Sequence, residues 1–253
     1  MTILDFEIFF LVICRIASFL TASPFLSMRS IPTILKIGFS LILAIIVFMI
    51  LPKSNIYITG PLMFYLILIK EVSMGLFMGF ITTLIFRAIQ MAGQMTDIQL
   101  GFAMSAIFDP ATQSSTSLFG RVYNWIGLVI FFTIDGHHYI LKAITDSFTL
   151  VPIGLASFEQ INLMDVGYIF SRSFLIAFQI GIPIIIVAFM SDVVMGLIAR
   201  TVPQLNVFII GLPFKVLVSL FAFLLLLPVV ANLMVSVIED VPKTMNQLMQ
   251  WLG

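Results

Sequence analysis

Three residues with metal-ligating or proton-transferring side chains stand together at one point of the sequence. In "TIDGHHYILKAITDSF", Asp135 is followed by His137 and His138, the only two histidines of the chain. Adjacent residues on a helix point about 100° apart, so the pair lacks the same-face arrangement of the H-E-x-x-H motif. Asp135-Gly136 between two apolar segments is typical of a turn before a helix. The sequence favours structural histidines, and we predict no metal ligands and no cofactor.

Other familiar catalytic patterns are missing from the sequence. It contains no G-x-S-x-G, no P-loop and no H-E-x-x-H. Cys14 is the only cysteine, which excludes an internal disulfide and a cysteine metal cluster. In its apolar segment it is expected to be a small packing residue. We predict no catalytic residue and a protein that is not an enzyme.

Charged residues interrupt otherwise apolar segments. Arg15 lies inside the first of them, while Lys70-Glu71 and Arg87 flank another. Charges at membrane depth are functional candidates by default. With twelve Lys and Arg against twelve Asp and Glu, salt bridges between helices or between subunits are the favoured interpretation.

The composition indicates the class of protein that must position these residues. The 253-residue chain is 61% hydrophobic and 9% charged, against roughly 25% charged residues in soluble domains, and its mean hydropathy is +1.18. This indicates an integral membrane or membrane-complex protein. A formal net charge of zero argues against nucleic acid as a partner. Asp5 and Glu7 stand where a signal peptide needs basic residues, which predicts an uncleaved first helix.

The predicted fold is all-α, built of long, kinked helical hairpins. Apolar runs persist in lipid as helices or closed barrels, and no strand-like alternation recurs here. Proline, glycine and charge positions place helices near residues 4–22, 33–51, 61–91, 93–108, 117–134, 136–149, 164–201 and 204–238.

Several uncharged runs are short for a membrane span. Ile37 to Leu51 and Val72 to Phe86 have 15 residues each. At 1.5 Å per residue such a run reaches about 22 Å, short of the roughly 30 Å hydrocarbon core. Either charges face a protein interior, or these helices pack on partner proteins instead of lipid.

The C-terminal third predicts a helical hairpin. Asp165 to Arg200 and Gln204 to Ile238 are largely apolar segments of about 35 residues. Pro203 favours a break between them, because it cannot donate a helical hydrogen bond. Further prolines favour kinks at Pro183, Pro213 and Pro228.

Two opposite charges lie at matching heights of this hairpin. Asp192 and Lys215 are each about eleven residues from a turn centred at Pro203-Gln204. An unpaired charge at that depth is costly, so we predict an ion pair between them. The alternative is that each residue meets a charge of a neighbouring subunit.

A polar segment interrupts the apolar sequence at "FAMSAIFDPATQSSTS", residues 102–117. Asp109-Pro110 is typical of a helix start, with Pro at the first helical position. Gln113 to Ser117 are five successive polar residues, which would be costly facing lipid. Non-helical polar backbone at membrane depth is tolerated where it lines a watery cavity or is buried in protein. We therefore predict a loop or broken helix that faces an aqueous path.

Four separated stretches of the sequence match one family of proteins: "SPFLSMRSIP" (23–32), "QMTDIQLGFAMSAIFDPATQSSTSLFG" (94–120), "DGHHYILKAITDSFTLVPIG" (135–154) and "ARTVPQLNVFIIGLPFK" (199–215). In these stretches the chain resembles the FliR/SctT family of membrane proteins of the type III secretion export apparatus. The resemblance covers nearly the whole length, in order.

This resemblance implies a subunit of a protein export gate. Family members form a closed helical assembly with FliP and FliQ, through which unfolded flagellar subunits pass, and they contact FlhB and work beside FlhA. The resemblance also implies the cytoplasmic (inner) membrane at the flagellar basal body. It implies one domain over 1–253, with a FliP-like part over about 1–160 and a FliQ-like hairpin and C-terminal tail over about 161–253.

The resemblance further implies a plug of the closed pore, carried over residue by residue to 102–117. The candidate plug residues are Phe102, Met104, Phe108, Asp109, Pro110, Gln113, Ser114, Ser115, Thr116 and Ser117. The hairpin tip falls on Pro203, Gln204, Asn206 and Phe208.

Three alternatives remain open from the sequence. The chain is the equivalent subunit of a virulence injectisome; or it is a secondary transporter with helices broken at Gly181-Ile182-Pro183 and Pro203; or it is an intramembrane hydrolase that uses Asp135 and His137. Saturable uptake by the chain alone would favour the transporter, whereas full function of His137→Ala would exclude the hydrolase.

Overall fold

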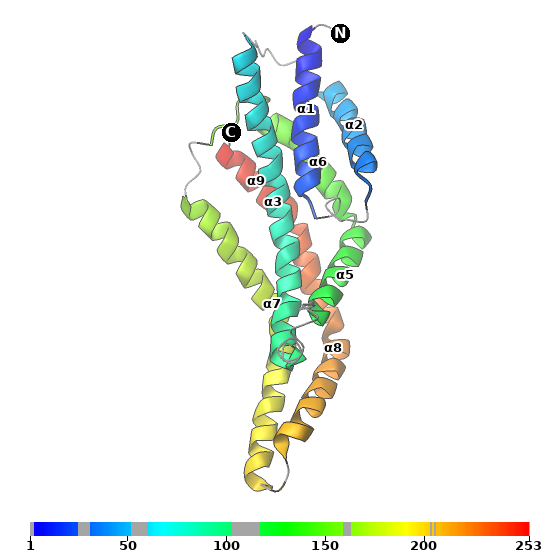
Figure 1. Cartoon of the computed structure of the whole chain (residues 1–253), viewed down its shortest axis with the longest axis vertical. Coiled ribbons are helices and arrows are strands. Elements are labelled where there is room, and N and C mark those ends of the chain that lie inside the picture. The colour runs from blue at the N-terminus through cyan, green and yellow to red at the C-terminus, as the bar shows by residue number, and fades with distance from the viewer. Residues whose placement is uncertain are drawn as a thin grey trace, which may run out of the picture. The chain divides into compact units, whose positions relative to one another are not determined.

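The described part of the chain is all-α, as predicted: its regular elements are α-helices (Figure 1). The computed structural model describes residues 3–24, 31–51, 60–102, 117–158, 163–202, 204 and 206–252. The helices are α1 (Ile3–Ala22), α2 (Thr33–Ile50), α3 (Pro61–Leu100), α5 (Leu118–Thr133), α6 (Gly136–Leu150), α7 (Leu163–Thr201), α8 (Val207–Glu239) and α9 (Val241–Leu252).

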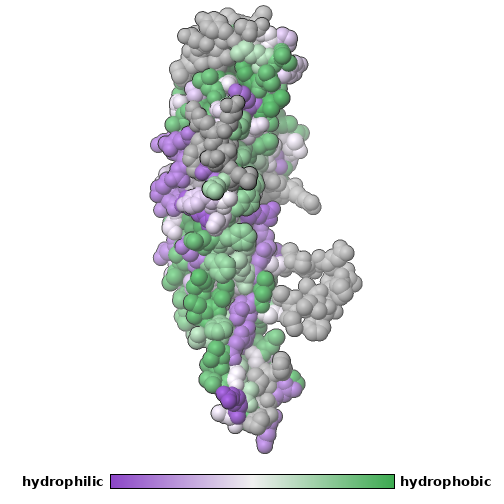
Figure 2. Space-filling model, turned by 90° about the vertical axis from the view of Figure 1, so that its left-hand side faces the viewer, coloured by the Kyte–Doolittle hydropathy of each residue, from purple (hydrophilic) through white to green (hydrophobic). Residues whose placement is uncertain are grey.

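Four helical segments of the described residues are long and apolar enough to cross a membrane. They are Thr33–Ile50, Pro61–Leu100, Met164–Thr201 and Ile209–Gln250, and α5 with α6 would make a fifth if together they form one bent span. Many large apolar side chains of α7 and α8 are exposed, and Figure 2 shows hydrophobic residues over much of the visible face. An apolar surface of this extent requires lipid or another protein to cover it.

One predicted helix boundary is wrong. Helices expected at 61–91 and 93–108 are a single helix as far as Leu100, because α3 continues through Gly93. A glycine inside a helix costs about 1 kcal/mol relative to alanine. Here tight packing against α5 compensates, as described below.

The C-terminal tail also holds more regular structure than expected. Residues 241–252 form α9, whose buried Met245, Leu248, Met249 and Leu252 follow a helical period. Helix α7 continues through Pro183 and α8 through Pro213 and Pro228, and the kinks expected at these prolines stay a prediction.

The chain divides into two compact units, neither of which is continuous in sequence. The first unit contains residues 1–84, 135–170 and 239–253, and the second contains residues 85–134 and 171–238. Helix α3 therefore contributes its first part to one unit and its last part to the other. The predicted FliP-like and FliQ-like division near residue 160 concerns resemblance to other proteins and stays a prediction.

The first unit is held together by α1, α2, the first part of α3, α6 and α9. Helix α1 packs on α2, and α6 packs on α9. Gly75 and Gly79 of α3 let it approach α1 closely, because a side chain at either position would meet backbone atoms of α1. The buried core there includes Leu11, Val12, Ile16, Phe19, Met74, Met78, Ile144 and Phe148.

The second unit combines the end of α3 with α5 and the α7–α8 hairpin. An aromatic cluster lies in its core: the ring of Phe223 is perpendicular to that of Phe119 at 5.2 Å and stacked on that of Tyr123 at 5.9 Å. Near the hairpin tip, the end of α7 and the beginning of α8 lie side by side (Figure 1), and Lys215 of α8 reaches Asp192 of α7. Gly181 of α7 lies close to Ala92 of α3, where a side chain would come within 3.3 Å of the Ala92 carbonyl oxygen.

Candidate functional site

The predicted polar segment connects α3 to α5. Phe102 and Ser117 are its described residues, whereas the other plug candidates lie outside the part that the structure describes: Met104, Phe108, Asp109, Pro110, Gln113, Ser114, Ser115 and Thr116. Gly101 follows α3 with a φ of +85°, a left-handed conformation that glycine adopts without strain. Ser117 is the N-cap of α5, so this helix begins at Leu118.

A buried carboxylate fastens the beginning of α5 to α3. Asp97 of α3 is 4% exposed. It accepts a hydrogen bond from the Ser117 hydroxyl, and the Phe119 backbone N–H lies 3.1 and 3.2 Å from its two oxygens. The Gly120 N–H donates to Ser117 Oγ at 2.8 Å. Two of the four unpaired N–H groups of the α5 N-terminus are thereby satisfied beside a negative charge.

Glycine residues allow close contact between α3 and the beginning of α5. A side chain at Gly93 would collide with the carbonyl group of Phe119, and one at Gly120 would collide with Ser117. The Phe102 ring lies 6.2 Å from the ring of Phe119. Both described ends of the 102–117 segment are therefore fixed to the same packed region, around Phe119.

Sequence reasoning did not single out Asp97. Its signal was present, because an acidic residue in a long, mainly apolar helix requires a partner if it is buried. The partner is mainly the backbone of another helix, which a sequence does not show. The contact emerges only when α3 and α5 are seen to cross at Gly93.

The predicted ion pair of the hairpin is present in the structure. Lys215 Nζ lies 2.6 Å from Asp192 Oδ2, and Gln99 Nε2 of α3 donates to the same oxygen at 3.3 Å. The Lys215 side chain is 15% exposed and the Asp192 side chain 47%. The pair therefore joins three helices of the second unit, and its role in the protein stays a prediction.

A cleft of about 320 Å³ opens beside this ion pair. Gly196 of α7 leaves the space open, because no atom lies within 4 Å of where its side chain would be. The lining residues are Leu100, Gly101, Asp192, Met195, Gly196, Gly211, Leu212 and Lys215. The cleft thus lies at the end of α3, next to the point where the 102–117 segment begins.

The hairpin tip lies where the sequence predicts it. Helix α7 ends at Thr201 and α8 begins at Val207. The Asn206 carbonyl accepts hydrogen bonds from the N–H groups of Ile209 and Ile210, which starts α8. Gln204 and Asn206 are exposed, Phe208 lies in the first turn of α8, and Pro203 is outside the described residues.

The first unit contains a second charged network, which is fully buried. Arg15 Nε lies 2.5 Å from Glu71 Oε2, and both side chains are 0% exposed. Arg15 Nη1 also donates to the carbonyls of Ser147 and Val151, each at 3.0 Å. The Gly154 N–H donates to Glu71 Oε1 at 2.9 Å. The sequence left open whether such charges form salt bridges between helices or between subunits. Arg15 and Glu71 form a salt bridge between two helices of one chain.

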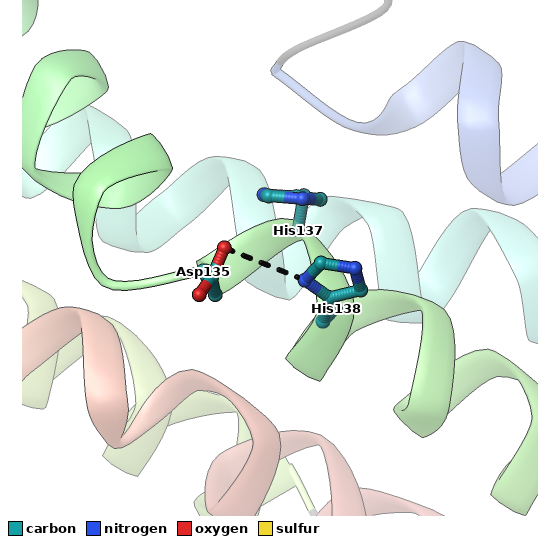
Figure 3. A group of neighbouring side chains, drawn as sticks. All are labelled: Asp135, His137 and His138. Atoms are coloured by element: carbon teal, nitrogen blue, oxygen red, sulfur yellow. Dashed lines mark ion pairs between the residues drawn. The ribbon is translucent and has the colours of Figure 1, made fainter.

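Asp135, His137 and His138 come together at the beginning of α6 (Figure 3). One potential ligand atom from each lies within 4.8 Å of the others. His138 Nδ1 is 3.5 Å from Asp135 Oδ1, and the two imidazole rings are 4.1 Å apart. The expected separation of adjacent histidines by 100° therefore does not keep the rings apart, because both side chains turn toward the same space.

Comparison with known proteins shows the family of this chain. A family described as "Bacterial export proteins, family 1" matches residues 6–241 of the chain. The flagellar biosynthetic protein FliR of Bacillus subtilis (strain 168) is 33% identical over 98% of this chain and 96% of its own length. The chain belongs to the FliR family.

Other FliR-family relatives extend the same picture. FliR of Escherichia coli (strain K12) is 24% identical over 93% of this chain and 94% of its own. The secretion system apparatus protein SsaT of Salmonella typhimurium is 31% identical over 62% of this chain and 61% of its own. This FliR-family chain is thus a multi-pass membrane component of a type III export apparatus, from a family of structural components rather than known enzymes.

Proposed function

We propose that this chain is a structural and gating subunit of the flagellar type III protein export channel. It completes a core complex with FliP and FliQ subunits in the cytoplasmic (inner) membrane, at the base of the flagellum, and works beside FlhB and FlhA. The match to FliR along nearly the whole of both chains carries this proposal.

The exposed apolar surface supports a place within a larger assembly. Apolar residues such as Phe174 and Phe178 of α7 and Leu220 and Leu224 of α8 are about half exposed or more. In water such surfaces would associate with other proteins or with lipid. In the proposed complex, FliP and FliQ subunits cover part of this surface and lipid covers the rest.

The gating role is assigned to the 102–117 segment. The two ends of the segment are anchored, because the Phe102 ring contacts Phe119 of α5 and the Ser117 hydroxyl donates to Asp97. Between these ends, Thr112 to Thr116 are uncharged polar residues that suit contact with an aqueous path. We assign the plug of the closed pore to this segment, and the passage of unfolded export substrates to the path beside it.

The test is a deletion of Thr112 to Thr116 that leaves Ser117 as the N-cap of α5. The assembled gate should form normally but conduct ions when closed, in planar-bilayer or whole-cell conductance measurements. A deletion of Ser54 to Ile58, of equal length in another connection, is the control and should leave the seal intact. A gate that stays sealed without Thr112 to Thr116 would refute the plug assignment.

The similarity to SsaT favours one second candidate, the equivalent subunit of an injectisome. The two functions differ in which apparatus the chain completes. Expression in a Bacillus subtilis strain that lacks its own FliR should restore swimming if the flagellar assignment is right. Restored secretion in a Salmonella strain that lacks SsaT, without restored swimming in the first strain, would favour the injectisome.

A further inference from the structure

We propose that Asp135, His137 and His138 form a binding site for a divalent transition-metal ion of the Zn²⁺ class. The ligands are one carboxylate oxygen and two imidazole nitrogens. This site plays no part in the plug assignment and stands on the geometry of the α6 N-terminus alone.

The proximity of the three donors is the first observation. One potential ligand atom from each residue lies within 4.8 Å of the other two. Two ligands of a tetrahedral Zn²⁺, each about 2.0–2.1 Å from the ion, lie roughly 3.4 Å apart. The side chains of Asp135 and His138 are 71% and 69% exposed, so small side-chain rotations are enough to close that difference.

The orientation of Asp135 is the second observation. Aspartate at an N-cap normally accepts a hydrogen bond from the first turn of its helix. The Asp135 side chain makes no such bond to α6, although the residue occupies the N-cap. Its Oδ1 instead faces His138 Nδ1 at 3.5 Å, and Figure 3 shows the carboxylate and this ring turned toward each other. Helix capping therefore does not explain where this carboxylate points.

The donor set defines the class of ion. Imidazole nitrogens suit Zn²⁺, Ni²⁺ and Cu²⁺, whereas Ca²⁺ and Mg²⁺ prefer oxygen ligands throughout. Three protein ligands leave a fourth position of a Zn²⁺ ion for water. Bound there, the ion would tie Asp135, which has a left-handed φ of 56°, to the first turn of α6 and stiffen the turn between α5 and α6.

The two histidines make the test selective, because the chain contains no others. The full-length protein should be purified in detergent with a tag that contains no histidine, and stripped of metal with a chelator. Histidine labelled with ¹⁵N then reports on this site alone. Addition of one equivalent of Zn²⁺ should shift the imidazole signals of both residues, and calorimetry should give one ion per chain.

Variants separate ligation from other effects. Asp135→Asn removes the charge but tolerates the left-handed backbone, and His138→Ala removes an exposed ring. Each should weaken Zn²⁺ binding about ten-fold or more, whereas Asp146→Asn, which removes another carboxylate of α6, should not. Unchanged imidazole signals at excess Zn²⁺ in the native protein, or native affinity in Asp135→Asn, would overturn the proposal. The native titration decides the question even if a variant fails to fold.

Discussion

Arg15 and Glu71 show what a charge inside an apolar helix does at the scale of single residues. Both are fully buried, and each has hydrogen-bonding partners besides the other. A buried ion pair pays a large desolvation cost, so its presence alone is weak evidence of a stabilising role. Removal of only one of the two residues is strongly destabilising, because an unpaired charge would remain in the core.

We expect Arg15→Met to destabilise the protein by about 3–5 kcal/mol, since Glu71 is left buried without its partner. The double variant Arg15→Met with Glu71→Met should recover most of that loss. Thermal unfolding of the detergent-solubilised protein measures both. Lys243→Met, which breaks an exposed pair with Asp240, is the control and should have little effect. A double variant no more stable than Arg15→Met alone would be inconsistent with this interpretation.

The ion pair of the hairpin gives a second prediction at this scale. Asp192→Lys and Lys215→Asp should each reduce recovery of the assembled complex, because each places two like charges together. The double swap restores opposite charges at the same positions and should restore most of the assembly, as measured by co-purification. If the swap is as defective as the single variants, the pair has another role, such as contact with a neighbouring subunit.

At the scale of elements, close helix crossings depend on glycine. Helices α3 and α5 cross at Gly93, where a side chain would collide with the Phe119 carbonyl. This crossing also brings Asp97 to the N-terminus of α5. The close crossing therefore requires a glycine inside α3, although glycine weakens an isolated helix.

We expect Gly93→Ala to destabilise the protein by about 1–3 kcal/mol, because the added methyl group overpacks the crossing. Gly38→Ala in α2 is the matched control, since no atom lies within 4 Å of the added carbon. That change should be neutral or should stabilise by about 0.5–1 kcal/mol. Thermal unfolding compares the two variants, and equal stability would mean that the crossing is looser than described.

The sequence predicted most helices within a few residues, because proline, glycine and charge mark their ends. The predicted helix break at Gly93 was wrong, because packing against α5 outweighs the low helix propensity of glycine. Helix α9 was missed, because its amphipathic pattern is only 12 residues long. The Asp192–Lys215 pair was predictable because a hairpin fixes its own register. The Asp97 cap and the Arg15 network were not, because their partners are largely backbone groups from distant parts of the chain.

At the scale of the whole molecule, long apolar helices and extensive exposed apolar surface belong to a protein that works inside a membrane assembly. The chain belongs to the FliR family along nearly its whole length. The uncharged run from Ile37 to Leu51 is short for a bilayer, but the helix that contains it, α2, is long and apolar enough to cross a membrane. We propose that this chain functions as one subunit of a larger export gate.

The most direct test is the mass of the particle that the tagged chain forms in detergent, measured by native mass spectrometry after co-expression with FliP and FliQ from the same genome. We predict one stable assembly that contains all three proteins. A chain recovered alone, with neither FliP nor FliQ bound under conditions that keep it folded, would contradict its assignment as a subunit of the export channel.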